Sequence, residues 1–248
     1  MSICIAIGHG KSNTGGYDQA FAEGNYDPGA VSGTTQEFKV AKEIGKYAAA
    51  YYNENYAEHC DLINYNGEYF LSERYKLANQ KGYDFLAELH LNAGGGTGTE
   101  VYHSVYNTNK TAATVSAAIA SAFGIKDRGG KTKTTSSGSD YFGIIRETRM
   151  EAILIETVFI DTPSDLALVS TAAGQKKMGE VIAKAIAKAR GVKEKDKTSK
   201  PDSKPPEKTD EGTVYRIQTG AFKSRQNADA YVQKLKEQGF PAIIIKDK

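Results

Sequence analysis

Hydrophobic residues recur along most of the chain at two different spacings. Short apolar runs such as Ser2–Ile7 and Ala152–Phe159 are typical of buried strands. Elsewhere the spacing is helical, as where Val40, Ala41 and Ile44 lie opposite charged side chains. The pattern predicts strands at 2–7, 60–65, 83–91, 99–106 and 152–159, and helices at 37–52, 71–81, 111–123 and 174–190. This alternation predicts an α/β fold, with a twisted, mostly parallel sheet flanked by helices.

The pattern stops at residues 193–211, KEKDKTSKPDSKPPEKTDE, which contain no aliphatic or aromatic side chain other than proline. Lysines and acidic residues are mixed throughout this stretch. Such a segment cannot bury enough apolar surface to offset the entropy lost on ordering it. We therefore expect a domain of residues 1–192, an extended linker of residues 193–212 and a small C-terminal module of residues 213–248.

Composition narrows the class of protein. Apolar residues make up 40% of the chain and charged residues 25%, as in ordinary globular proteins. The net charge of +2 does not predict a nucleic-acid-binding protein. No run of about 18 apolar residues occurs, so we expect no membrane span. The N-terminus has no basic leader, so we expect no signal peptide and synthesis in the cytoplasm.

Two of the four histidines lie where predicted strands end. His9 follows the strand ICIAI between two glycines, and His90 follows FLAEL. Ligands in parallel α/β sheets bind outside the carboxyl ends of the strands, and neutral imidazole is a common zinc ligand. Each histidine by itself also fits a polar residue that is simply hydrogen-bonded at a strand end.

Two glutamates are candidates for the same site. Glu37 opens a predicted helix, and Thr34-x-x-Glu37 also matches a capping box, in which the glutamate binds the cap amide. Glu156 lies inside the apolar run AILIETVFI, where a carboxylate is costly to bury unless it is paired, metal-bound or protonated. Pairing with Arg146 or Arg149, or a side chain that reaches solvent, is the structural alternative for Glu156.

These four residues suit a catalytic zinc site. Such a site has three protein ligands and an open position for water or substrate, while a further glutamate acts as general base. The sequence contains no local signature such as H-E-x-x-H, so spacing alone does not establish the site.

The chain resembles the zinc-dependent N-acetylmuramoyl-L-alanine amidases of bacterial autolysins and phage endolysins over residues 3–190. The matching motifs occur in family order and include the L-x-x-R-x-x-x-A-N helix at residues 71–79. The others are Gly8-His9-Gly10, Asp27-Pro28-Gly29-Ala30 followed by Glu37, Leu89-His90-Leu91-Asn92-Ala93, Ile153-Leu154-Ile155-Glu156 with Phe159-Ile160, and Asp165-Leu166.

This resemblance implies that His9, Glu37 and His90 bind Zn²⁺ and that Glu156 is the catalytic base. The implied reaction is hydrolysis of the amide between N-acetylmuramic acid and L-alanine in bacterial peptidoglycan. Asn92, Arg74, Arg146 and the loop of residues 126–141 are further candidates for contacts with the substrate. For that loop, a mobile surface segment is the alternative interpretation.

The sequence departs from the family pattern at several positions, none of which removes a proposed ligand. Glu88-Leu89 stands where the family usually has Ser-Ile before the histidine. Val158 replaces a frequent glycine, and Glu151 a frequent proline. The stretch between His9 and Tyr26 looks like an inserted loop beside the site. These differences concern fine specificity for the substrate rather than the chemistry.

The C-terminal module resembles the first half of the sporulation-related (SPOR) peptidoglycan-binding repeat. The resemblance rests on the motif Tyr215-Arg216-Ile217-Gln218-Thr219-Gly220-Ala221-Phe222. A predicted helix and the apolar run AIII follow it, so the sequence predicts a small β-α-β module. A stretch of about 36 residues is marginal for independent folding. Either the module is incomplete, or two copies complete each other by pairing strand edges, which would give a dimer.

Two other functions remain open. The protein could be a catalytically silent peptidoglycan-binding protein, although the intact set of candidate ligands argues against this. It could also be a metallopeptidase that cuts within the stem peptide. Without a signal peptide, we expect the protein to reach the cell wall after release from the cytoplasm, as a phage endolysin or a lysis-associated autolysin.

Overall fold

The computed structural model describes residues 2–12, 26–196, 224–237 and 244. The chain divides into two units, Met1–Asp196 and Lys197–Lys248. Most of the predicted inserted loop, most of the predicted linker and both predicted strands of the C-terminal module lie outside the described residues.

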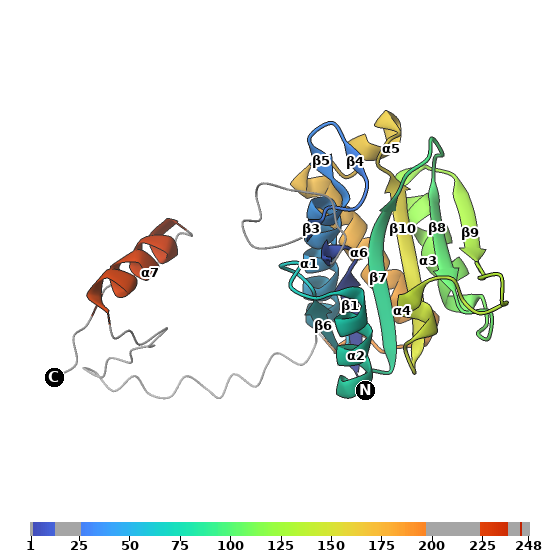
Figure 1. Cartoon of the computed structure of the whole chain (residues 1–248), viewed down its shortest axis with the longest axis horizontal. Helices are drawn as coiled ribbons and strands as arrows, with labels where there is room; N and C mark the ends of the chain where they lie inside the picture. The colour runs from blue at the N-terminus through green and yellow to red at the C-terminus, as the bar shows by residue number, and fades with distance from the viewer. Residues whose placement is uncertain (1, 13–25, 197–223, 238–243, 245–248) are drawn as a thin grey trace. The chain divides into compact units, whose positions relative to one another are not determined.

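The first unit is built on a twisted sheet (Figure 1). In the described part of the chain, six strands form it in the order β6-β1-β7-β10-β8-β9. All neighbouring pairs are parallel except β10 and β8. The strands are β1 (Ser2–Ile7), β6 (His59–Ile63), β7 (Phe85–Asn92), β8 (Thr99–His103), β9 (Asp127–Lys131) and β10 (Glu151–Phe159).

Helices cover the two faces of the sheet unequally (Figure 1). One face packs against three long helices: α1 (Glu37–Asn55), α3 (Lys110–Phe123) and α6 (Ala172–Arg190). In the described part of the chain, the other face carries only α2 (Leu71–Lys81) and the short α4 (Gly143–Arg146). A further short helix, α5 (Pro163–Ala167), follows β10. The second face is therefore covered only in part, which leaves room for a site.

The alternation of side chains along each strand decides which residues reach that second face. In β7, Phe85, Ala87 and Leu89 enter the core beneath the three long helices. The residues between them point to the opposite face. Glu88 and His90 are thereby placed on the side of α2 and α4. The same alternation in β10 places Glu156 on that side as well.

Two small antiparallel pairs build the loops around the carboxyl end of β1. They are β2 (Gly10–Lys11) with β3 (Tyr26–Asp27), and β4 (Val31–Ser32) with β5 (Thr35–Gln36). The first pair brings Asp27 next to the segment that carries His9. The second pair leads directly into α1.

The predicted α/β fold is confirmed, with three local differences. Strand β8 runs antiparallel to β10. The predicted loop at residues 126–141 contains strand β9, which pairs with β8. Its sequence of glycines and charged residues has no strand-like apolar pattern, so the strand was not predicted. Residues 193–196 belong to the first unit, because the backbone of Lys193 and Lys195 is hydrogen-bonded to the segment that ends α1.

The described part of the second unit is helix α7 (Arg225–Glu237). An ion pair between Arg225 and Asp229, one turn apart, supports this helix.

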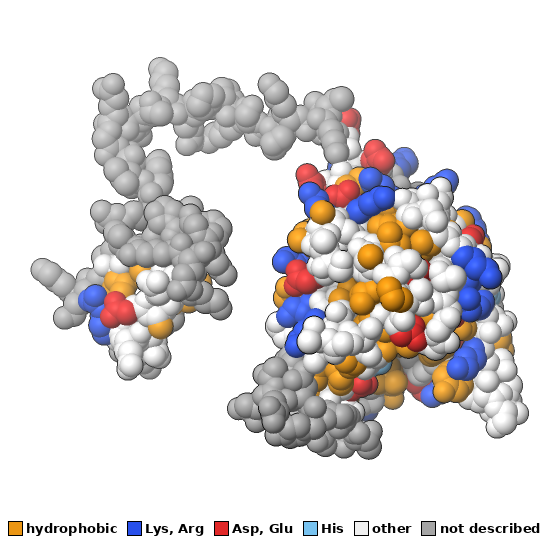
Figure 2. All heavy atoms as spheres, turned by 90° about the horizontal axis from the view of Figure 1, so that it is seen from above, with side chains coloured by type: hydrophobic (Ala, Val, Ile, Leu, Met, Phe, Trp, Pro, Cys, Tyr) orange, Lys and Arg blue, Asp and Glu red, His pale blue; other side chains and the backbone are white. Residues whose placement is uncertain are grey.

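On the face shown in Figure 2, acidic and basic side chains of the described residues are interspersed around hydrophobic ones. Among the described residues, none of the helices is both apolar and long enough to span a membrane.

Candidate active site

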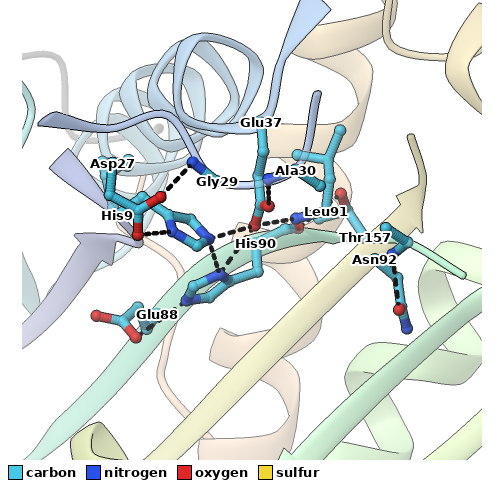
Figure 3. Close-up of polar contacts among 12 residues, drawn as sticks. His9, Asp27, Gly29, Ala30, Glu37, Glu88, His90, Leu91, Asn92 and Thr157 are labelled. Atoms are coloured by element: carbon cyan, nitrogen blue, oxygen red, sulfur yellow. Dashed lines mark hydrogen bonds and ion pairs between the residues drawn. The ribbon is translucent and has the colours of Figure 1, made fainter. Parts of the chain in front are cut away.

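His9 lies immediately after β1 in an unusual backbone conformation. Its φ angle is +64°, in the left-handed region that non-glycine residues rarely adopt. Its carbonyl oxygen accepts hydrogen bonds from Asn64 Nδ2 and Arg74 Nη1, each at 2.8 Å. On the imidazole, Nδ1 lies 2.8 Å from Asp27 Oδ2. These contacts leave Nε2 pointing toward Glu37 and His90 (Figure 3).

Glu37 is the first residue of α1, and its side chain is buried. Its Oε2 accepts a hydrogen bond from the Ala30 amide at 2.8 Å, and its Oε1 accepts one from the Leu91 amide at 3.0 Å. Oε1 also lies 3.0 Å from His9 Nε2 and 2.9 Å from His90 Nδ1.

The capping box at Thr34 and Glu37, the alternative role for Glu37, does not form. The N-cap of α1 is Gln36, which makes no side-chain cap hydrogen bond. The first amides of the helix instead donate to backbone carbonyls, from Glu37 to Ala30 and from Phe38 to Pro28. The loop before the helix therefore satisfies these amides, and the Glu37 carboxylate is available to the histidines.

His90 lies on β7 beside the other two residues. Its Nδ1 is 3.1 Å from His9 Nε2, and its Nε2 is 3.1 Å from Glu88 Oε2. Burial disfavours the protonated form of both imidazoles. Even so, the neighbouring carboxylates raise the pKa of His9 and hold the pKa of His90 well above its usual value. Burial likewise opposes ionisation of Glu37, but hydrogen bonds from both imidazoles keep its pKa below its usual range.

The three residues fit a metal ion. One ligand atom from each of His9, Glu37 and His90 lies within 4.8 Å of the others. A tetrahedral zinc ion with ligands at about 2.0–2.1 Å would place these atoms about 3.3 Å apart. The second nitrogen of each imidazole meets a carboxylate, Asp27 for His9 and Glu88 for His90. Such outer carboxylates are usual where histidine binds a metal.

Glu156 lies beside this group, on the neighbouring strand β10. Its Oε2 is buried and has no hydrogen-bond partner among the described residues. Loss of hydration on burial raises the pKa of Glu156 to about 7; His90 opposes this shift, and Glu37 and Glu100 reinforce it. A carboxylate with such a pKa accepts and releases a proton near neutral pH.

A cavity of about 760 Å³ opens in front of these residues. Its polar wall carries the four predicted catalytic and metal-binding residues, together with Asp27 and Asn92. The opposite wall comes from α2 and α4 and the residues that precede them, including Phe70, Leu71, Tyr75 and Phe142. The cavity is large enough for a sugar or peptide segment, since pockets for small ligands measure about 300–1,000 Å³.

The three residues predicted to contact substrate all line this cavity but differ in exposure. The Arg146 side chain is 38% exposed at the rim. Asn92 donates a hydrogen bond to Glu100, which is itself held by Arg128 and Lys131. The Arg74 side chain is only 5% exposed, and its guanidinium donates to Glu88 and to two backbone carbonyls. Arg74 is thus bound within the protein.

The sequence interpretation assigned no role to three residues that support the site. Asp27 and Asn64 contact His9, and Glu88 contacts His90. A signal existed for Glu88, because it lies two residues before His90 and therefore on the same face of the strand. For Asn64, the contact depends on the tertiary structure.

The sheet and its cavity define an α/β protein with two histidines and two glutamates gathered at one cavity, where the strands β1, β7 and β10 end and helix α1 begins. The chain belongs to the Amidase_3 family, the N-acetylmuramoyl-L-alanine amidases, whose model matches residues 3–188. This match confirms the predicted enzyme class.

Two known proteins illustrate the relationship in sequence. The sporulation-specific N-acetylmuramoyl-L-alanine amidase of Bacillus subtilis strain 168 is 29% identical over 229 residues, which cover 90% of this chain and 81% of that protein. The endolysin of Bacillus phage SPP1 is 28% identical over 188 residues, covering 72% of this chain and 67% of that protein.

A solved structure shows the same fold. The crystal structure of N-acetylmuramoyl-L-alanine amidase from Clostridium difficile 630 aligns with a TM-score of 0.63 and 26% sequence identity. It covers 77% of this chain and 96% of that one.

The SPOR domain model matches residues 184–248, which confirms the resemblance of the C-terminal module to that family. The match is longer than the predicted module of residues 213–248. Its first residues lie in α6, which packs against α1 and α3 in the first unit.

Proposed function

We propose that the protein is a zinc-dependent hydrolase that cleaves the amide between the lactyl group of N-acetylmuramic acid and L-alanine in peptidoglycan. One observation carries this proposal: His9, Glu37 and His90 converge at the edge of one cavity beside Glu156, whose buried Oε2 has no hydrogen-bond partner among the described residues. Membership of the amidase family supports the choice of bond.

The four residues have different roles in the proposed reaction. His9, Glu37 and His90 would hold zinc, which when bound polarises the substrate carbonyl and lowers the pKa of a water molecule. Glu156 takes a proton from the attacking water and passes it to the departing amine nitrogen of L-alanine. The water oxygen joins the lactyl carbon as the carbon–nitrogen bond breaks, so that the products are a carboxylate and a free amine.

Digestion of purified peptidoglycan tests the proposal. Incubation with zinc is expected to release new N-terminal alanine, and a metal chelator should suppress this product. A different new N-terminus would mean that the enzyme cuts within the stem peptide. No product, together with binding to the insoluble wall, would instead indicate a silent peptidoglycan-binding protein.

The place of action and the C-terminal module form part of the same proposal. Peptidoglycan lies outside the cytoplasmic membrane, so the enzyme would act there after release, as a phage endolysin or a lysis-associated autolysin. The SPOR-like module would hold the enzyme on its polymeric substrate. Fractionation of producing cells before and after lysis tests the first point. Sedimentation of the full chain tests the predicted dimerisation through this module.

A further inference from the structure

Glu88 connects the two histidines of the candidate metal site through a buried ion pair. Its Oε1 accepts a hydrogen bond from Arg74 Nε at 2.9 Å, and its Oε2 lies 3.1 Å from His90 Nε2. The Glu88 and Arg74 side chains are only 3% and 5% exposed. Arg74 then continues to His9, whose carbonyl oxygen it binds at 2.8 Å. Figure 3 shows the Glu88 carboxylate beside the His90 ring.

The contact with Glu88 determines which nitrogen of His90 is available to a metal. Ionised carboxylates only accept hydrogen bonds, so His90 Nε2 must carry the proton that faces Glu88. Without a metal, Nδ1 faces the Glu37 carboxylate in the same way; with a metal in the site, Nδ1 is the nitrogen that offers its lone pair, while Nε2 keeps its proton toward Glu88. His90 Nδ1 points to the place where Glu37 Oε1 and His9 Nε2 meet, 2.9 and 3.1 Å away.

Arg74 keeps the Glu88 carboxylate charged in its buried position. The ion pair offsets the cost of burying the carboxylate and holds its second oxygen toward His90 Nε2. The same guanidinium holds the left-handed backbone of His9 in place. A serine at this position would have a shorter, uncharged side chain and could not form this ion pair.

We propose that Glu88 is a positioning residue, which fixes the tautomer and orientation of His90 for metal binding, with Arg74 as its counter-charge. The inference rests on the proposed function, because it concerns ligands of the proposed zinc site. It assigns Arg74 to the support of the site rather than to direct contact with substrate.

Three variants of the full chain test this role. Glu88→Gln removes the charge, and Glu88→Ser removes the charge and shortens the side chain. Glu88→Asp keeps the charge beside Arg74 but draws the carboxylate back from His90, and it is the variant to use if the other two do not fold. Glu58→Gln is the matched control, because Glu58 forms another buried ion pair, with Arg190 at 3.0 Å, away from the cavity.

Two measurements apply to each folded variant. Zinc affinity is determined by competition with a chromophoric chelator, and the tautomer of His90 is read from ¹⁵N chemical shifts of the zinc-loaded protein. We expect affinity to fall by about 10–100-fold in the Glu88 variants, as for other outer-shell partners of zinc ligands. The tautomer signal should also shift away from a pure Nε2–H form. Glu58→Gln should change neither quantity.

The outcomes separate this inference from the proposed function. Glu88 variants that bind zinc as tightly as the wild type, with His90 still protonated at Nε2, would overturn the positioning role alone. A wild-type protein that binds no zinc through His9, Glu37 and His90 would overturn the proposed function and this inference with it.

Discussion

Glu156 of β10 is the direct register partner of His90 of β7 in a parallel ladder. Both side chains therefore point to the same face of the sheet, next to the same cavity. The register shifts between Glu156 and Phe159, and the pairing resumes where Phe159 lies opposite Asn92. A slip of one residue would turn Glu156 into the hydrophobic core. The sheet register thus places the proposed base beside a proposed ligand.

Glu156→Gln should abolish most catalysis and leave zinc binding intact. Glutamine has nearly the same shape but cannot accept the proton of the attacking water, so kcat should fall by about 10²–10⁴-fold. Glu151→Gln is the control, because Glu151 begins the same strand but does not line the cavity. Release of N-terminal alanine and zinc content are measured together. Near-normal turnover of Glu156→Gln would refute the proposed role.

The raised pKa of Glu156 also predicts a pH-dependent difference in stability. Burial raises this pKa from an ordinary 4.5 to about 7. The stabilising effect of the neutral carboxyl is therefore complete below about pH 4.5 and is lost as the pH rises through about 7. In metal-free protein, Glu156→Gln should unfold with a free energy higher than that of the wild type by roughly 1–3 kcal/mol at about pH 8.

Denaturant unfolding at several pH values, with a chelator present, measures this difference. The gain from Glu156→Gln should shrink steadily as the pH is lowered toward about 5. A gain that stays the same across this range would show that Glu156 does not titrate there in the folded protein.

Elements with strong periodicity could be predicted from the sequence, whereas contacts between distant residues could not. The apolar alternation of β1 and β10 and the helical spacing of α1 identify these elements directly. Strand β9 escaped prediction because its sequence, DRGGK, has no apolar side chain and is held by pairing with β8. Arg74 was predicted to contact substrate, but the tertiary structure places Glu88 within its reach.

In the candidate site, the motifs that resemble the family predicted four residues, His9, Glu37, His90 and Glu156. The structure brings these four side chains together at one cavity. No motif assigned a role to the supporting residues. Asp27 reaches His9 only because β2 pairs with β3, and this depends on the folded loop.

Zinc removal should destabilise the protein as well as inactivate it. A ligand that binds only the folded state adds about 4 kcal/mol at a thousand times its Kd. Thermal unfolding should therefore occur at a higher temperature with zinc than with chelator. The variant His90→Ala should lose this zinc-dependent difference. If the variant keeps the full difference, zinc stabilises the protein at some other site.

Gly29→Ala should damage the metal site through a direct clash. A Cβ at Gly29 would lie 2.6 Å from Glu37 Oε2 and 2.7 Å from His9 Cδ2. Gly33→Ala is the matched control, since both glycines have a left-handed φ, +72° and +59°, but a Cβ at Gly33 meets no described atom within 4 Å. Each variant should lose about 1–2 kcal/mol of stability from backbone strain.

Only Gly29→Ala should also lose zinc affinity, by at least about tenfold, because its proposed ligands must move. Competition with a chelator measures the affinity of both variants. Equal affinities would mean that the site adjusts to the added methyl group and is less rigid than its hydrogen bonds imply.

Arg146→Ala should weaken productive binding of substrate without affecting zinc. The Arg146 side chain lies at the cavity rim, where its Nε pairs with Glu147 and its Nη1 donates to the carbonyls of Asp140 and Tyr141. These contacts hold the guanidinium in place while the side chain stays 38% exposed, so that it can also meet a carboxylate of the stem peptide. Arg149→Ala removes the same charge nearby, but Arg149 does not line the cavity. With a soluble muropeptide, Arg146→Ala should lower kcat/KM by about tenfold, equivalent to about 1.4 kcal/mol, mainly through a higher KM. If Arg149→Ala has the same effect, the contribution of Arg146 is one of general charge and not of a specific contact.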